Sequence, residues 1–406
     1  MKHILIFAIG CSILTAAAQP MPSVGTWRAT VTIQNKEVPF LIEVKPRSPE
    51  APPIFVIRNG QERIEATDVS LRNDSLVISM PVFDSEIIVK AGSKHLTGFF
   101  RKNLPGNAIY RVPFEARYGE MHRFQKNPKP VTAQISGKWE VVFTNPDGRT
   151  SQAIGIFHQN DNDLTGTFLT PTGDYRFLEG QISDNRLSLS TFNGESILLF
   201  EGAVKGDSIT GETWSGISGY RRWHARRNEN AHLPDPEKLT YLKPGYDRLS
   251  FRFPNMENQP VSLDDPRYKG KVVIVQLLGS WCPNCMDETA FLAPYYDAHK
   301  DKGLEVIGLA YERSPQFEEA RPRILKMMKR LNVHYEVLFA GTTDKEAANQ
   351  TLPMLNAVIA YPTTIFIDKK GVVRKIHTGF SGPGTGHYYT EYVEEFDRFV
   401  KQLLSE

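Results

Sequence analysis

Cysteine is scarce in this sequence: the 406 residues include only three, at Cys11, Cys282 and Cys285. Cys11 falls in an N-terminal apolar segment, so a chain that loses this segment keeps two cysteines. Two cysteines cannot build a framework of structural disulfides, and they are too few for a four-cysteine zinc site. No pair of histidines has the spacing that would complete such a site. Any cysteine chemistry is therefore concentrated in one short segment, and we expect no bound metal and no cofactor.

The sequence also lacks an excess of charge and, after its N-terminus, a long apolar run. Lys and Arg number 48 against 46 Asp and Glu, so the formal net charge is only +2. This balance provides no electrostatic basis for binding nucleic acid or an anionic membrane. A membrane-spanning helix needs roughly 20 apolar residues, so we expect no transmembrane span. The chain is 40% hydrophobic and 23% charged, which is typical of a globular protein of two or three domains at this length.

The N-terminus has the pattern of a targeting segment. Lys2 precedes an apolar run at residues 4–14, and three alanines follow, ending at Ala18. A positive start, a hydrophobic run and small residues predict a signal peptide over residues 1–18, and hence a periplasmic or secreted protein. The alternative is a lipoprotein signal with an anchor at Cys11. The apolar run continues beyond Cys11, which favours simple cleavage after Ala18.

Residues 24–227 have the alternation and turn residues of an all-β region. Apolar side chains recur at every second position in segments such as 27–33, 40–44 and 76–80, and Gly, Asn and Asp separate such segments. This period of two is the pattern of half-buried strands joined by tight turns. The region therefore predicts a β-barrel or a β-sandwich.

An internal repeat divides this β region in two. Gly25-Thr26-Trp27 matches Gly137-Lys138-Trp139, and three further blocks recur in the same order at offsets near 110 residues. A steady offset predicts two copies of one β-unit, over residues 24–118 and 136–227. We call them the first and second β-units; whether they form two bodies or two halves of one stays open at this point.

The pattern changes in the last third of the chain. Residues 228–247 are polar and contain prolines, as expected of a linker. Within residues 248–406, apolar segments of strand length alternate with helical patterns, and residues 272–278 form an almost continuous apolar strand. Such an alternation predicts an α/β sheet, and a tight hairpin expected over residues 363–376 adds an antiparallel edge to it. The fold class is therefore multidomain, with an all-β tandem repeat before an α/β domain.

The segment Trp281-Cys282-Pro283-Asn284-Cys285 directly follows the apolar strand and opens the next predicted helix. Free N–H groups and the helix dipole at a helix N-terminus favour a thiolate, the nucleophilic form of cysteine. With two residues between them, the second sulfur can reach the first. We therefore expect an exposed Cys282 that attacks a disulfide and a Cys285 that resolves the mixed disulfide. Pro283 suits the first helical turn, where no backbone donor is needed.

Residues 248–406 resemble the thioredoxin superfamily, in particular the TlpA-like thiol–disulfide oxidoreductases. The resemblance rests on residues 251–254 leading into 269–273, on residues 281–288, and on residues 361–368. It implies a thioredoxin-like fold with Cys282 and Cys285 as the redox-active disulfide.

The resemblance also assigns roles to residues around the two cysteines. Glu288 resembles the helix glutamate that handles protons beneath the dithiol, and Pro362 resembles the cis-proline that offers its backbone to a substrate. The other residues that the resemblance places at the substrate site are Trp281, Pro283, Asn284, Tyr361 and Thr363.

Three positions depart from the pattern of thioredoxin itself. Gln276 stands where thioredoxin has a buried aspartate, which puts a direct copy of its proton relay in doubt. The proline expected in the active-site helix falls at Ala290, with Pro294 one turn later, so the helix kink is expected to be displaced. Tyr361 is bulkier than the usual residue before the cis-proline, so it is expected to narrow the substrate groove.

Two functions from different classes follow. The first is an exported thiol–disulfide oxidoreductase that reduces disulfide-bearing exported proteins and is recharged by a redox partner. The second is a scaffold protein of the cell envelope whose β-units recognise a ligand or partner. The complete pair Cys282 and Cys285, together with Glu288 and Pro362, favours the first function. The direction of the chemistry depends on the reduction potential, which the sequence does not contain.

Overall fold

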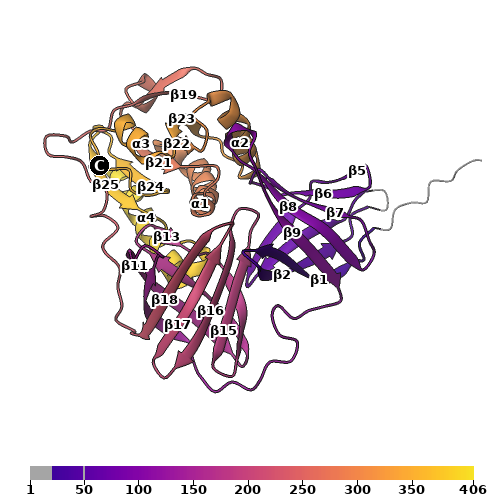
Figure 1. Cartoon of the computed structure of the whole chain (residues 1–406). Coiled ribbons are helices and arrows are strands. Elements are labelled where there is room, and N and C mark those ends of the chain that lie inside the picture. Colours follow the sequence, from indigo (N-terminus) through magenta and orange to yellow (C-terminus); the bar gives the residue numbers. More distant parts are fainter. Residues whose placement is uncertain (1–20, 49–50) are drawn as a thin grey trace, which may run out of the picture.

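Two β-rich units precede an α/β domain in the structure, a computed structural model that describes residues 21–48 and 51–406 (Figure 1). The signal peptide expected at residues 1–18, with Cys11, lies outside the described residues. Within the described part of the chain, no helix is both long enough and apolar enough to cross a membrane.

The first β-unit is one antiparallel sheet with the strand order β4-β3-β2-β1-β9-β8-β7-β6-β5. The first strand of the unit, β1, pairs with both β2 and the last strand, β9. The chain therefore ends the unit beside the strand with which it began. The strands are β1 (Gly25–Ile33), β2 (Lys36–Lys45), β3 (Ile54–Asn59), β4 (Glu62–Ala66), β5 (Val69–Arg72), β6 (Ser75–Ser79), β7 (Ser85–Lys90), β8 (His95–Asn103) and β9 (Ile109–Tyr118).

The second β-unit is also antiparallel, with the order β11-β10-β18-β17-β16-β15-β14-β12-β13. An additional pairing between β11 and β12 closes this sheet into a barrel. The second β-unit is therefore a barrel and not a sandwich. The strands are β10 (Gly137–Thr144), β11 (Thr150–Asn160), β12 (Asp163–Thr170), β13 (Gly173–Asp174), β14 (Leu178–Ser183), β15 (Arg186–Phe192), β16 (Ile197–Lys205), β17 (Ser208–Ser215) and β18 (Gly219–Arg227).

The tryptophan at the start of each β-unit has the same surroundings. Trp27 and Trp139 are fully buried, and each indole Nε1 donates to the carbonyl oxygen four residues earlier, at Ser23 and Ile135, over 2.9 Å. Both tryptophans are core residues, and each holds the segment just before the first strand of its β-unit. Two copies of one unit would share this contact, and the duplication itself stays a prediction.

The C-terminal domain is built on a five-stranded sheet with the order β23-β22-β21-β24-β25. β21 runs parallel to β22 and antiparallel to β24, and all seven of its residues are buried, as its sequence predicts. The elements are β19 (Arg252–Pro254), β20 (Pro260–Ser262), β21 (Val272–Leu278), α1 (Pro283–His299), β22 (Leu304–Glu312), α2 (Phe317–Arg330), β23 (Glu336–Thr342), α3 (Lys345–Thr351), β24 (Thr363–Ile367), β25 (Val373–Thr378) and α4 (His387–Ser405). The predicted multidomain class, all-β followed by thioredoxin-like α/β, is confirmed.

The three parts are in contact with one another, and Figure 1 shows α1 on the side of the C-terminal domain that faces the β-units. Glu195, between β15 and β16, joins all three parts. Its carboxylate lies 2.8 Å from Lys102 of the first β-unit and 2.6 Å from Arg313 of the C-terminal domain. Only 9% of the Glu195 side chain is exposed, so water screens these ion pairs less than it would on an open surface.

The connector between the second β-unit and the C-terminal domain, expected as a linker over residues 228–247, lies along the C-terminal domain. Thr240 in this segment is fully buried. Backbone hydrogen bonds join the connector to strands and loops of the domain: Lys243 N to Met354 O at 2.8 Å, Thr378 N to Pro236 O at 3.0 Å, and Val373 N to Asp247 O at 2.9 Å.

These contacts predict that a fragment of residues 228–406 is more stable than one of residues 248–406. Removing the connector leaves backbone groups of β25 and of the loop after α3 without their partners, and such losses cost about 1 kcal/mol each. Urea unfolding of the two fragments measures the difference. Equal midpoints would show that the connector contributes nothing to the domain.

Candidate active site

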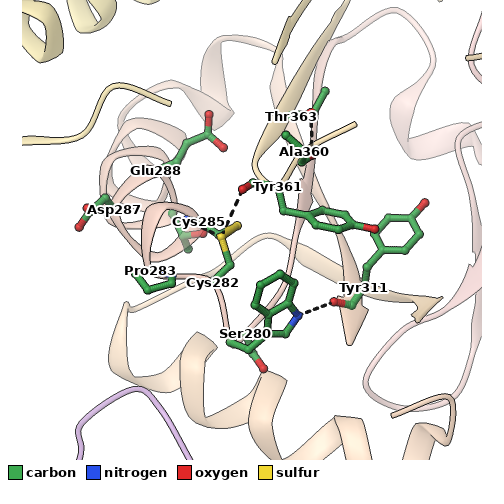
Figure 2. Close-up of a disulfide and its surroundings, with 12 residues drawn as sticks. Ser280, Cys282, Pro283, Cys285, Asp287, Glu288, Tyr311, Ala360, Tyr361 and Thr363 are labelled. Carbon is green, nitrogen blue, oxygen red and sulfur yellow. Dashed lines mark hydrogen bonds between the residues drawn. A yellow bond between two sulfur atoms is a disulfide. The ribbon is translucent and has the colours of Figure 1, made fainter. Parts of the chain in front are cut away.

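Cys282 is the N-cap residue of α1, and Cys285 lies in the first turn of this helix. The two sulfurs form a disulfide, and the backbone N–H of Cys285 points at Cys282 Sγ over 3.2 Å (Figure 2). Pro283 occupies the first helical position, as its sequence context predicts. The helix N-terminus therefore directs backbone N–H groups at the sulfur on which negative charge develops when the disulfide is opened.

The cis-proline segment lies against the same sulfur. The Tyr361–Pro362 peptide bond is cis, as the resemblance implied, and Cys282 Sγ lies 3.4 Å from the carbonyl oxygen of Tyr361. The Tyr361 ring meets the Trp281 ring edge-on at 6.0 Å. Thr363, which follows Pro362, is buried. Its hydroxyl donates to Ala360 O, and this bond holds the two ends of the cis-proline turn together. The structure thus brings both predicted halves of the site together.

Trp281 packs sideways against the sheet. Its indole Nε1 donates to Tyr311 O at the end of β22, over 2.9 Å. The indole of Trp281 can lie here only because residue 279 is a glycine: a Cβ at Gly279 would be 2.3 Å from Trp281 Nε1. Asn284 lies in the first turn of α1, and its Nδ2 finds no hydrogen-bond partner among the described residues.

The expectation that Cys282 is exposed is wrong for this structure. Only 4% of its surface is accessible, and Cys285 is fully buried. The sequence suggests exposure because a residue at a helix N-terminus normally faces solvent. Here Trp281 and Tyr361 flank the sulfur, and the second β-unit rests on the next two residues. Arg176, from the loop before β14, donates to Pro283 O at 2.9 Å.

Glu288, one turn beyond Cys285, is fully buried and holds three hydrogen bonds. Its Oε1 accepts from the Thr364 hydroxyl at 2.6 Å and from the Tyr392 hydroxyl at 3.0 Å, while its Oε2 accepts from Gln276 Nε2 at 2.8 Å. Burial raises the pKa of Glu288 above its ordinary value, and the three hydrogen bonds oppose that rise. Gln276, noted above as a departure from thioredoxin, thus orients the carboxylate in place of a second acid.

Two further carboxylates near the disulfide, the buried Glu312 and the largely enclosed Asp287, were not predicted from the sequence. Glu312, at the end of β22, accepts from the Ser280 backbone N–H at 2.7 Å and from the Ser280 hydroxyl at 2.8 Å, and burial raises its pKa to about 7. Asp287, two residues after Cys285, pairs with Arg176, and burial raises its pKa to about 7 although Arg176 lowers it. The only sequence signal for Asp287 is its place inside the motif.

A disulfide across the first turn of a helix, beside a cis-proline on a five-stranded α/β sheet, defines the class of thioredoxin-like thiol–disulfide oxidoreductases. Comparison with known proteins gives the same class for this part of the chain. Residues 244–391 match the Redoxin family model. The C-terminal part of the chain is thus a Redoxin domain.

The relatives of this part of the chain are named as thioredoxin-like or thiol–disulfide interchange proteins. The chain is 26% identical to the thioredoxin-like protein YneN of Bacillus subtilis, over 40% of this chain and 84% of YneN. It is also 26% identical to the thiol:disulfide interchange protein DsbE of Vibrio cholerae, over 37% of this chain and 73% of DsbE. A crystal structure of a thiol:disulfide interchange protein from Chlorobium tepidum is 25% identical, with a TM-score of 0.30, over 39% of this chain and 95% of that chain.

We predict that Glu288→Gln slows turnover by about tenfold or more, because an amide cannot accept a proton from the dithiol. The pH–rate profile should lose the limb that reports the carboxylate. Circular dichroism and urea unfolding check that the domain stays folded, since glutamine has the same shape. An unchanged pH–rate profile would remove Glu288 from the chemistry.

The raised pKa of Glu312 predicts a pH-dependent stability. The folded protein holds the Glu312 proton up to about pH 7, whereas the unfolded chain releases it near its ordinary value of about 4.3. The stabilisation is therefore complete below the unfolded pKa and is lost as the pH rises toward 7. Glu312→Gln can still accept the Ser280 backbone N–H bond and does not titrate, so it should be more stable than wild type at pH 8, by about 4 kcal/mol at most, and similar to it near pH 4.

Urea unfolding at several pH values measures this difference. Glu257→Gln, at an exposed glutamate of the same domain, is the matched control and should follow wild type at every pH. If Glu312→Gln also follows wild type throughout, Glu312 is not protonated in the folded protein.

Proposed function

We propose that this protein is an exported thiol–disulfide oxidoreductase that reduces disulfides in other exported proteins, with Cys282 as the attacking residue and Cys285 as the resolving residue. The observation that carries the proposal is the disulfide at the N-terminus of α1, where the Cys285 N–H lies 3.2 Å from Cys282 Sγ. That N–H stabilises a thiolate on Cys282, because Cys282 Sγ is the sulfur at which it points.

The reaction takes place in two exchange steps. In the reduced protein, the Cys282 thiolate attacks one sulfur of a substrate disulfide, and the other substrate sulfur leaves as a thiolate that takes up a proton. The Cys285 thiol then loses its proton, and its sulfur attacks Cys282 Sγ and releases the second substrate thiol. Two electrons and two protons pass to the substrate, and the protein retains the disulfide seen in the structure. A reducing thiol partner must then restore the dithiol.

Two side-chain environments support these steps. Glu288 is assigned to take the proton from Cys285, because it lies one turn farther along the same helix and its pKa is raised by burial. Pro362 is assigned to align the substrate, because the carbonyl of the preceding residue lies beside Cys282 Sγ. Trp281, Pro283 and Asn284 would form the remaining walls of the substrate site.

Export is part of the proposal and is supported by the sequence of residues 1–18, with cleavage after Ala18 and a lipid anchor at Cys11 as the alternative. In the periplasm or outside the cell, disulfide-bearing proteins are abundant substrates. The scaffold function is the second candidate: it gives the β-units a partner to recognise, but it has no use for a complete dithiol.

We predict that Cys285→Ser traps a mixed disulfide between Cys282 and the substrate, because the resolving sulfur is missing. Cys282→Ser should trap none, since Cys285 is buried behind it. Non-reducing electrophoresis with mass spectrometry identifies the linked species, and the double variant is the control. Trapping by both single variants would contradict the assigned order of attack.

A further inference from the structure

Residues 171–176, called the strap below, connect β12 to β14 in the second β-unit and lie on the first turn of α1. Arg176 Nη1 donates to Pro283 O at 2.9 Å. Gly173 packs so closely on Asn284 that a Cβ at Gly173 would lie 3.1 Å from Asn284 Nδ2. The strap therefore covers both residues between the two cysteines.

The strap also reaches the far side of the cis-proline segment. Asp174 Oδ2 accepts from the Gly382 backbone N–H at 2.7 Å. A Cβ at Gly379 would lie 2.9 Å from the Thr172 carbonyl carbon, so no side chain fits between the two backbones. Gly379 N in turn donates to Pro362 O at 2.8 Å. The strap thus bridges the helix start and the loop that is bonded to the cis-proline.

Arg176 anchors the strap by an ion cluster that joins all three parts of the molecule. Its guanidinium pairs with Glu62 of the first β-unit and with Asp287 of α1. Only 15% of the Arg176 side chain and 7% of the Glu62 side chain are exposed. Such an enclosed cation is strongly held, because removing it leaves buried carboxylates without compensation.

We propose that the strap occupies the groove in which an extended segment of a protein substrate binds, and that the substrate must displace it to reach Cys282. The inference rests on the proposed function. Exchange requires the incoming sulfur to contact Cys282 Sγ, yet only 4% of Cys282 is exposed beneath its neighbours. Gly173 and Asp174 of the strap pair with Thr170 and Leu169 of β12, so a short piece of strand lies against the first turn of α1. Asn284 Nδ2 has no hydrogen-bond partner among the described residues, so it is a donor that the substrate chain can use.

Other contacts between the β-units and the C-terminal domain do not involve the strap, so the strap can move by itself. Glu195 holds Lys102 and Arg313 on the Trp281 side of the site, and Arg323 pairs with Asp84 at 3.0 Å. These contacts keep the β-units on the C-terminal domain when the strap leaves. They also line a cavity of about 180 Å³ next to Trp281, into which no strap residue extends.

The first test is steady-state reduction of insulin by the full-length protein, with dithiothreitol as the electron donor. Arg176→Ala loosens the strap, so KM for insulin should fall by about threefold or more, because less binding energy is used to displace the strap. Arg149→Ala is the matched control: it removes an exposed arginine that pairs with Asp147 in the same β-unit, and it should behave as wild type. An unchanged or higher KM in a folded Arg176→Ala variant, with wild type active, overturns the inference.

The second test leaves the strap unaltered. Full-length Cys285→Ser is linked to a short cysteine-containing peptide, and amide hydrogen exchange is compared with that of the unlinked variant. Exchange in residues 171–176 should accelerate in the linked form, because Tyr175 N loses its bond to Phe168 O, while β17 should not change. Unchanged exchange in the strap overturns the inference even if Arg176→Ala fails to fold. If wild type reduces no insulin and Cys285→Ser traps no peptide, the proposed function itself fails.

Discussion

The contact between Arg176 and the first turn of α1 is the constraint on which the rest of this structure depends. One guanidinium binds the Pro283 carbonyl, the Asp287 carboxylate and the Glu62 carboxylate, so it joins the reactive turn to both β-units. Because these groups are largely enclosed, the contact holds residues 171–176 of the second β-unit on the turn that carries the two cysteines.

Three acids lie close to the dithiol in the sequence or through a direct contact, and burial raises the pKa of each. Glu288 and Asp287 are on the same helix as the two cysteines, and Glu312 accepts hydrogen bonds from Ser280, two residues before Cys282. Burying ionisable groups is costly, and a core of apolar side chains would be more stable. Their presence is therefore better explained by chemistry or by control of access than by stability.

The described β-units contain no cysteine, yet they contact the helical turn that carries both cysteines of the C-terminal domain. In the second unit, a closed barrel supports the loop that carries Asp174 and Arg176, so the loop is presented on a rigid frame. In the first unit, Glu62 contributes a carboxylate to the same cluster. Both β-units therefore contribute side chains to one ion cluster at the first turn of α1.

The sequence by itself determined the local parts of this protein. The continuous apolar run at β21 predicted a strand buried on both faces, the position of Cys282 predicted the start of a helix, and the segment beginning at Tyr361 predicted the cis-proline strand. Each follows from side-chain periodicity or from a motif within a few residues. Tertiary structure decided the closed barrel of the second unit, the burial of Cys282 and the partners of Glu288. Arg176 lies 106 positions before Cys282 in a segment with no motif, and only folding brings it to the dithiol. Long-range charge pairing leaves no periodic trace in a sequence, because it depends on how separate domains pack.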